Sequence, residues 1–329
     1  MFSPLSQFSP VDRWKTFFFM RTMQSVVNSQ SLDNERGCVL SIGNFDGVHR
    51  GHQVILSALR KYAAALNVPA VAMTFEPHPA VLLKPGSTPP RVTTALQKAA
   101  LIRENGIDRV FEYPTDWTLL NLTPQEFFDR IVVQQLNAVG LVEGPNFFFG
   151  KGRSGNTRTL ESFCRDSGRF LEIVPPATLG DQIISSSLIR QSLANGDVER
   201  AAEFLGRPYE IAGTIVSGAQ RGRTIGFPTA NLAEIETVIP APGVYAAMAK
   251  VQGRKEKAAV SIGPNPTFAD EQSKVEAHLL DVSGDFYGQA MSLRFIVRVR
   301  GLQKFSSKEE LQHQIQKDVA SVQSVLKTD

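Results

Sequence analysis

The chain has 329 residues, of which 42% are hydrophobic and 20% are charged, and its formal net charge is +3. This length suits two domains, and the composition is ordinary for a globular protein. A net charge so close to zero, without a basic block, argues against a nucleic-acid-binding protein. The chain contains no apolar run of roughly 18 residues, so we expect no membrane contact and a cytoplasmic protein. Cys38 and Cys164 lack CxxC spacing, which predicts two buried free thiols.

The first half of the chain alternates apolar strand-like runs with helical patterns. The segment that begins at Thr123 has a Thr cap, a Pro at the first helical position and a Glu at the third. Repeated strand–helix units predict a parallel sheet with helices on both faces. The predicted strands are 37–43, 68–75, 107–114, 138–144 and 170–176, and the predicted helices are 52–67, 95–106, 123–137, 159–168, 185–196 and 197–206.

The pattern changes near residue 204, after which strand-like runs follow one another without helices between them. Such a series predicts an antiparallel sandwich or barrel. A helix with a Ser cap is predicted over 306–326. The predicted strands are 209–218, 243–253, 256–263, 274–284 and 290–301, and the last of them alternates so that one face carries Met291, Leu293, Phe295, Val297 and Val299.

We therefore predict an α/β protein of two domains. A Rossmann-like domain with a parallel sheet covers residues 37–203, and an antiparallel β-barrel domain with a terminal helix covers residues 204–329. Residues 1–36 show neither pattern, and we expect them to form a poorly ordered extension.

The stretch GNFDGVHRGH, residues 43–52, lies between the first predicted strand and the first predicted helix. Ligands of open parallel sheets bind at the carboxyl ends of the strands, and a helix N-terminus suits a phosphate. His49 and His52 project from one face of the first helical turn and could donate to a phosphate as charge builds on its oxygens. Two alternatives stay open: a metal half-site completed by His78, and a purely structural pair of histidines.

Two further segments are compatible with a nucleotide. Residues 144–156 form a Gly-rich loop after the fourth strand, in which Asn146 could meet a base or flavin edge and Lys151 and Arg153 could meet phosphates. Alternatively, this loop is only a connection. The stretch ISSSLIR, residues 184–190, places three serines at a helix N-terminus and Arg190 one turn later. This is a helix cap by default and also an oxyanion-binding arrangement.

The motifs GNFDGVHRGH and ISSSLIR together resemble the HxGH nucleotidylyltransferase superfamily. TFEPHP (74–79) and GPNFFFGKGRSG (144–155) make the domain similar to the adenylyltransferase module of bacterial bifunctional FAD synthetases. The resemblance implies transfer of AMP from ATP to the phosphate of FMN, with His49, His52 and Arg190 as catalytic residues. It implies a flavin-side loop at Asn146 and Phe147, and ATP binding by Gly43, Asn44, Phe45, Asp46, Gly47, His49, His52, Ser185, Ser186, Ser187 and Arg190.

The second domain contains RGRTIGFPTANL, residues 221–232, in which Thr229 and Asn231 are two apart and face one side of an extended segment. Hydroxyl and amide oxygens suit Mg²⁺ that carries phosphate, although a polar turn is the simpler interpretation. Glu276 alternates with Val275 and Ala277 in a predicted strand. Such a carboxylate is paired, solvated at an edge, or a general base.

The motifs GRTIGFPTANL, PGVYA, SIGPNPTF, VEAHLLD and DFYG follow in this order and resemble the riboflavin kinase module. This resemblance implies a six-stranded barrel with a terminal helix. It also implies Mg²⁺ binding by Thr229 and Asn231, with Glu276 as the base that takes the proton of the ribityl hydroxyl attacking the γ-phosphate of ATP. The implied ATP-binding residues of this module are Arg223, Thr224, Gly226, Pro228, Thr229 and Asn231.

The leading hypothesis is therefore a bifunctional enzyme that makes FMN from riboflavin and then FAD from FMN. Its partners would be small molecules (riboflavin, FMN and ATP), and the protein would be a monomer or a weak homo-oligomer. Two alternatives stay open: an enzyme in which one half only supports the other, and a flavin-binding regulator without turnover.

Overall fold

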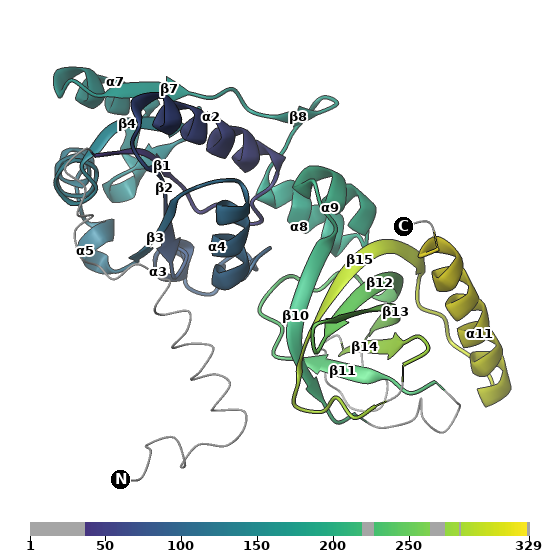
Figure 1. Cartoon of the computed structure of the whole chain (residues 1–329). Helices are drawn as coiled ribbons and strands as arrows, with labels where there is room; N and C mark the ends of the chain where they lie inside the picture. Colours follow the sequence, from purple (N-terminus) through teal and green to yellow (C-terminus); the bar gives the residue numbers. More distant parts are fainter. Residues whose placement is uncertain (1–36, 219–226, 264–273, 283, 328–329) are drawn as a thin grey trace, which may run out of the picture. The chain divides into compact units, whose positions relative to one another are not determined.

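The computed structural model describes residues 37–218, 227–263, 274–282 and 284–327. These residues fold as two compact units (Figure 1). The first unit comprises the chain up to Pro89 together with Ala95–Ile184, and the second comprises Pro90–Thr94 together with the chain from Ser185 onward. The predicted extension over 1–36 lies outside the described residues, and the predicted boundary at residue 203 stays a prediction.

The first unit contains a five-stranded sheet with the order β3-β2-β1-β4-β7, in which all neighbours are parallel. The predicted α/β architecture is thus confirmed. The strands are β1 (Cys38–Ile42), β2 (Ala70–Glu76), β3 (Arg109–Pro114), β4 (Ala138–Glu143) and β7 (Phe170–Ile173), and short pairs are formed by β5 (Phe148–Phe149) with β6 (Gly155–Asn156) and by β8 (Thr178–Leu179) with β9 (Gln182–Ile183). The helices are α2 (Arg50–Leu66), α3 (Ala80–Leu83), α4 (Ala95–Glu104), α5 (Trp117–Leu120), α6 (Pro124–Phe127), η1 (Phe128–Gln135), η2 (Lys151–Arg153) and α7 (Thr157–Asp166).

Both faces of the parallel sheet are covered by apolar side chains. Leu40 of β1 packs in one cluster with Ile131 of η1, and its neighbour Val39 packs in another with Leu56 of α2 and Ile102 of α4. All five residues of β1 are buried. A strand buried on both faces explains why β1 has a nearly continuous apolar sequence and no alternation.

The helical segment after Thr123 begins as predicted but winds differently further on. The Thr123 hydroxyl accepts from the Glu126 N–H, and the Glu126 carboxylate accepts from the Thr123 N–H, which completes a capping box. From Phe128 the chain continues as the π-helix η1, and Leu136 N–H donates to Ile131 O at 3.0 Å. Apolar spacing predicts a helical face here but does not distinguish the two windings.

The second unit contains a closed barrel with the strand order β10-β11-β14-β13-β12-β15, and all neighbours are antiparallel. This confirms the expected six-stranded barrel and adds β11, which lies in the polar PTANL stretch where apolar alternation does not indicate a strand. The strands are β10 (Tyr209–Val216), β11 (Ala230–Ala233), β12 (Gly243–Val251), β13 (Arg254–Gly263), β14 (Lys274–Leu279) and β15 (Ala290–Arg300), and the helices are α8 (Ser186–Ala194), α9 (Val198–Leu205) and α11 (Lys308–Val325).

The predicted alternation along β15 holds for only half of the strand. Met291, Leu293 and Phe295 are buried, but the register against β12 shifts between the partners of Ala246 and Ala247. Beyond this bulge, Val297 and Val299 pack with the cluster that contains α11 residues. A bulge inserts one residue and reverses the faces that follow, so the prediction of a single face for all five side chains was wrong.

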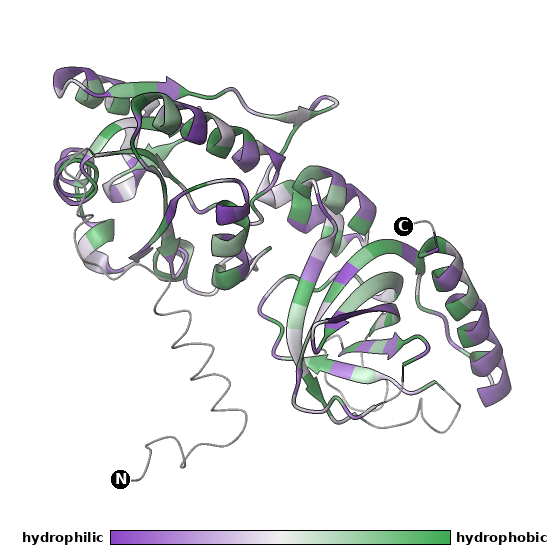
Figure 2. Ribbon diagram, in the orientation of Figure 1, coloured by the Kyte–Doolittle hydropathy of each residue, from purple (hydrophilic) through white to green (hydrophobic). Residues whose placement is uncertain are grey.

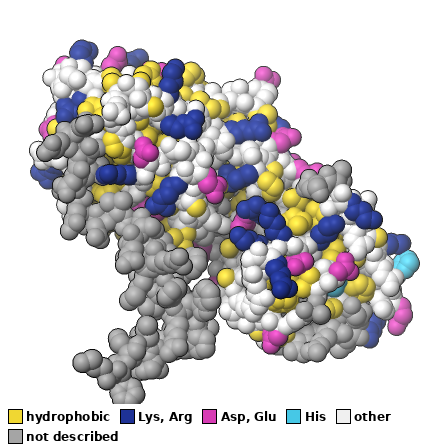
Figure 3. Space-filling model, in the orientation of Figure 1, with side chains coloured by type: hydrophobic (Ala, Val, Ile, Leu, Met, Phe, Trp, Pro, Cys, Tyr) yellow, Lys and Arg dark blue, Asp and Glu magenta, His cyan; other side chains and the backbone are white. Residues whose placement is uncertain are grey.

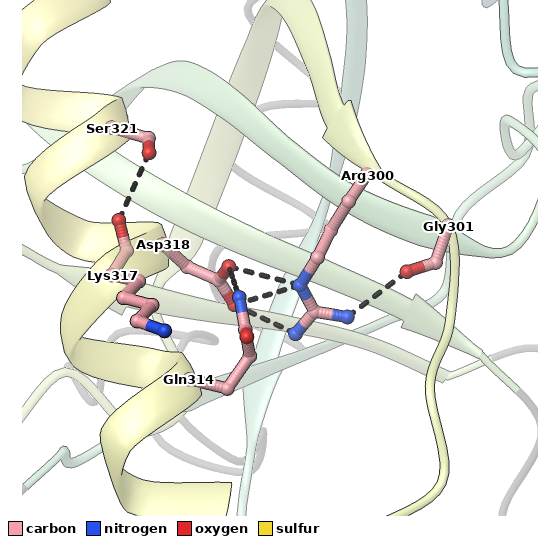
Figure 4. Close-up of polar contacts among 6 residues, drawn as sticks. All are labelled: Arg300, Gly301, Gln314, Lys317, Asp318 and Ser321. Carbon is pink, nitrogen blue, oxygen red and sulfur yellow. Dashed lines mark hydrogen bonds and ion pairs between the residues drawn. The ribbon is translucent and has the colours of Figure 1, made fainter.

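Helix α11 covers part of the outer surface of the barrel and carries one apolar and one polar side (Figures 1 and 2). Val322 and Leu326 pack against Ala246 and Leu280. Asp318 accepts two bonds from Arg300 Nε and one from Nη2 at 2.7 Å, and it also accepts from Gln314 (Figure 4). The two charged side chains are only 16% and 7% exposed. A bidentate ion pair therefore connects the helix to the end of β15.

Both cysteines are buried free thiols, as predicted. Burial raises the pKa of Cys38 to about 12 and that of Cys164 to about 11. Within the described residues, no helix is both long and apolar enough to cross a membrane. On the face seen in Figure 3, basic and acidic side chains are interspersed rather than gathered into a patch of one sign.

We expect Asp318→Ala to destabilise the second unit by about 3–5 kcal/mol, because it leaves the Arg300 guanidinium buried without its partner. The measurement is urea unfolding, monitored by far-UV circular dichroism. The control is Asp166→Ala, which removes an ion pair with Arg165 whose side chains are 70% and 66% exposed and should change the free energy of unfolding little. Equal effects of the two substitutions would contradict this assignment.

Candidate active sites

The turn that follows β1 is anchored to the neighbouring strand β2. Gly43 N–H donates to Met73 O at 3.0 Å, and the Thr74 hydroxyl donates to Asn44 O at 3.2 Å. These bonds hold the start of the GNFDGVHRGH stretch at the carboxyl end of the parallel sheet. That edge is where parallel sheets bind their ligands.

The middle of this turn adopts backbone conformations that are uncommon for its residues. Phe45 has a φ of 47° and Val48 a φ of 40°, and Val48 N–H donates to Phe45 O at 3.0 Å. A left-handed conformation at a β-branched residue costs of the order of 1–3 kcal/mol. The side chains of Phe45 and Val48 are almost fully buried, at 2% and 0% exposure, so packing holds the strained turn in place.

His49 is the N-cap of α2, and its ring Nδ1 accepts from His52 N–H at 3.3 Å. A ring nitrogen that accepts a bond carries no proton, so neutral His49 has its hydrogen on Nε2. The two imidazole rings stack at a centroid distance of 3.7 Å. A Cβ atom on Gly51 would lie 3.1 Å from the His49 ring, so glycine at this position gives the ring its room.

His52 packs between the rings of Phe45 and His49. Phe45 meets its ring edge-to-face at 5.2 Å, and its Nδ1 atom is buried without a hydrogen-bond partner among the described residues. Burial, and then the neighbouring His49, lower the pKa of His52 well below its usual value. The lowered pKa of His52 favours its neutral imidazole beside the stacked His49 ring.

The alternative of a metal half-site finds little support. His78, the predicted third ligand, uses its Nδ1 to accept from Ala80 N–H at 3.0 Å. In the described parts of the chain, no group of three His, Cys, Asp or Glu side chains is placed to hold a metal ion. The orientation of His49 as a helix cap serves a phosphate-binding turn better than a metal site.

Glu143 is a polar residue of this region that the sequence analysis missed. Its side chain is 2% exposed, and its Oε1 accepts from Ile42 N–H at 2.7 Å. Burial raises the pKa of Glu143 well above its usual range, and the bond from Ile42 lowers it only in part. The one available signal was a lone acidic residue at the end of an apolar strand.

The loop after β4 carries the predicted flavin-side residues. Asn146 is exposed, whereas Phe147 is half-buried, packs against the core and stacks on Phe149 at 5.4 Å. Lys151 and Arg153 are exposed, and the Arg153 guanidinium lies 4.6 Å from the centre of the Phe148 ring. Because β4 and β1 are parallel neighbours, this loop and the histidine turn leave the same edge of the sheet.

The ISSSLIR motif is a helix cap in the structure. Ser185 is the N-cap of α8, and its hydroxyl accepts from Leu188 N–H at 3.3 Å. Arg190 Nε donates to Pro90 O at 2.7 Å. Both segments belong to the second unit, and the role of these residues toward phosphate stays a prediction.

The barrel places three polar residues in a row across adjacent strands. Glu276 of β14 is directly opposite Asn231 of β11 on one side and Ser261 of β13 on the other. Directly opposed residues of antiparallel strands point to the same face, with Cβ atoms about 5 Å apart. Val275 and Ala277 on the other face are buried, and Glu276 is half-buried. The structure therefore brings together the predicted base and one predicted metal ligand.

Gly218 lies next to Asn231, and His278 contacts the residue before Thr229. A Cβ atom on Gly218 would lie 2.1 Å from the Asn231 amide nitrogen, so a larger residue there would require the Asn231 side chain to shift. The His278 ring Nδ1 lies 2.8 Å from Pro228 O, directly before Thr229, which is half-buried. A cavity of about 420 Å³ is lined by residues 216–218, 231–235, 239, 274 and 275. The predicted ATP-binding residues Arg223, Thr224 and Gly226 lie outside the described residues.

The chain thus combines a parallel α/β unit, with a strained turn at the ligand-binding edge of its sheet, and a closed barrel on which a carboxylate and an amide are neighbours. Two such units are the architecture of a two-domain transferase. Residues 31–188 match the family model described as FAD synthetase, and residues 205–326 match the one described as riboflavin kinase. The chain belongs to the family of bifunctional riboflavin kinase/FMN adenylyltransferases.

Curated members of this family align over most of the chain. The bifunctional riboflavin kinase/FMN adenylyltransferase of Escherichia coli strain K12 is 37% identical, with 91% of this chain and 96% of the relative covered. The one of Bacillus subtilis strain 168 is 36% identical, with 85% and 90% covered. A crystal structure from Streptococcus pneumoniae, described as a macrolide-efflux protein, is similar with a TM-score of 0.82 and 31% identity, covering 90% of this chain and 97% of that one.

We expect the stability of the first unit to depend on the protonation of His52. The folded state holds the pKa of His52 below its usual value near 6.5, so the unfolded state binds the proton first as the pH falls. The free energy of unfolding should therefore decrease below about pH 6.5, by at most about 1.4 kcal/mol per pH unit from this residue.

The measurement is urea unfolding between pH 5 and 8 of the natural chain and of the His52→Asn variant. Other titrating groups, including Glu143, are common to both proteins and cancel in the difference. The difference in unfolding free energy should be constant above the usual pKa of histidine and should shrink below it. A difference that does not vary with pH would contradict the lowered pKa.

Proposed function

We propose that the chain catalyses two successive reactions: phosphorylation of riboflavin by ATP to give FMN, and transfer of AMP from a second ATP to FMN to give FAD and pyrophosphate. The observation that carries this proposal is the presence of both arrangements in one chain. The stacked His49–His52 pair stands at the sheet edge of the first unit, and the Asn231–Glu276 pair stands on the barrel of the second.

For adenylyl transfer, the phosphate of FMN attacks the α-phosphorus of ATP, and pyrophosphate leaves from the opposite side. No enzyme nucleophile is required, so the protein contributes positioning and charge stabilisation. We assign to His49, whose Nδ1 accepts the helix-cap bond, donation from Nε2 to an oxygen of the transferring phosphate. We assign ATP binding also to the residues of the turn, to Ser185, Ser186 and Ser187, and to Arg190, and flavin binding to Asn146 and Phe147.

For the kinase reaction, Glu276 accepts the proton of the riboflavin 5′-hydroxyl as that oxygen attacks the γ-phosphate of ATP, and ADP leaves. The half-buried Glu276 carboxylate stands beside the Asn231 amide, so a base and an oxygen ligand occupy one face of the sheet. Thr229 and Asn231 offer the hard oxygen atoms that Mg²⁺ prefers. Bound there, Mg²⁺ would neutralise charge on the ATP phosphates.

We further propose that the enzyme acts in the cytoplasm on small molecules only, without nucleic acid or membrane as a partner, as a monomer or a weak homo-oligomer. The interspersed charges on the surface seen in Figure 3 and the small net charge support the part of this proposal that excludes nucleic acid.

The proposal is tested by incubation with riboflavin, ATP and Mg²⁺ and separation of the flavin products. FMN and FAD should both form. FMN alone, or FAD only from added FMN, would indicate that one half merely supports the other. Bound flavin without turnover would indicate a flavin-binding regulator.

We expect Glu276→Gln to lower FMN formation by about 100-fold or more, because the ribityl hydroxyl loses its base. FAD formation from supplied FMN should remain within about twofold of the natural chain, since the adenylyl-transfer site has its own residues. The matched control is Ser261→Ala, which changes the other neighbour of Glu276 without removing the base. Loss of both reactions in Glu276→Gln would contradict the assignment of two sites.

His49 allows the capping role to be separated from the catalytic role. Asparagine is a good N-cap, so His49→Asn should keep the stability of α2, whereas His49→Ala should cost about 1 kcal/mol. Both variants should lose about 100-fold or more in FAD formation from FMN, because both lack the imidazole donor. Kinase activity and urea unfolding are measured side by side. Full adenylyl transfer by His49→Asn would exclude the imidazole from the mechanism.

A further inference from the structure

The order of the parallel sheet determines where its ligand crevice opens. From β1 the chain proceeds to β2 and β3 on one side and later to β4 and β7 on the other. The connections therefore diverge between β1 and β4, and open α/β sheets bind their ligands in the crevice at such a switch point. Backbone pairing between β1 and β4 runs only to Leu40 and Leu141. Glu143 comes two residues later and is the last residue of β4.

Glu143 is bonded to both strands that flank its own. Its carbonyl oxygen accepts from Val174 N–H at 2.8 Å and so continues the ladder with β7. Its side chain is directed to β1 instead, where Oε1 accepts from Ile42 N–H at 2.7 Å. The carboxyl group thus takes the place of a main-chain acceptor at the point where the β1–β4 ladder has ended.

The two residues that this bond joins each precede one of the two proposed binding loops. Ile42 is followed by Gly43 and the histidine turn, and Glu143 is followed by Gly144 and the loop that carries Asn146. A Cβ atom on Gly144 would already contact Ile55 of α2 at 3.4 Å, so this end of β4 also adjoins the first helix. A change in the Glu143 bond would therefore move one loop against the other.

We propose that Glu143 is a positioning residue for adenylyl transfer, which sets the ATP-binding turn after β1 against the flavin-side loop after β4 through its bond to Ile42 N–H. It is not a catalytic residue, because its side chain is 2% exposed and does not reach a substrate. The inference rests on the proposed adenylyl-transfer function of this edge of the sheet.

The chemistry of the site explains why a buried acid is placed there. An apolar residue at this position would leave the Ile42 N–H buried without an acceptor. Burial raises the pKa of Glu143, which favours the uncharged acid over the carboxylate at this position. Glutamine is therefore a close mimic that keeps the acceptor oxygen.

The test compares Glu143→Gln with Glu143→Leu in the full chain. Adenylyl transfer is measured as kcat and KM for ATP and for FMN, with riboflavin kinase activity as the internal control for folded protein. Glu143→Leu should lower kcat/KM for FAD formation by about 10- to 100-fold, since small misplacements of reacting groups have effects of that size. Glu143→Gln should restore it to within about threefold, and kinase activity should be unchanged in both.

A structural role alone would lower the melting temperature without lowering kcat for each folded molecule. Tyr62→Phe serves as the matched control, because it removes one 2.8 Å side-chain bond, to Glu172, in the same unit. Full adenylyl transfer by Glu143→Leu would overturn the proposal, and so would equal losses in Glu143→Leu and Glu143→Gln. A natural chain that forms no FAD would instead contradict the proposed function itself.

Discussion

β1 lies in the middle of a parallel sheet and is buried on both faces, so none of its side chains can reach a ligand. Polar chemistry is therefore confined to the end of the strand, where the backbone leaves the sheet. Met73 and Thr74 of β2 hold the turn that follows, and the carboxyl group of Glu143 on β4 holds Ile42 at the end of β1. The two neighbours of β1 thus fix where the turn begins, and with it the positions of Phe45, His49 and the start of α2.

The same turn shows how a local conflict is accommodated by packing. Phe45 and Val48 adopt positive φ values that their side chains disfavour, yet both side chains are buried in the core. The strained backbone presents His49 as the cap of α2 and stacks its ring on His52. Burial lowers the pKa of His52, so this arrangement avoids burying a second positive charge beside His49.

The barrel arranges its polar groups by a different constraint. Closure of the six strands removes every open edge of this sheet, and antiparallel register then decides which residues become neighbours. Asn231, Glu276 and Ser261 are far apart in the sequence but form one row because their strands are adjacent. The bulge in β15 similarly turns Val297 and Val299 toward the cluster under α11, and the Arg300–Asp318 ion pair connects that helix to the strand.

The amino-acid sequence alone determined the alternation of strands and helices, the change to a barrel near residue 204, the capping box at Thr123 and the motifs that carry His49, His52 and Glu276. These features depend on local periodicity and residue type, which a single sequence displays. Tertiary structure alone decided the π-winding of η1, the strand β11, the bulge in β15 and the bond between Glu143 and Ile42. Each of these depends on which segments become neighbours in space, and strand pairing between distant residues is not encoded in local patterns.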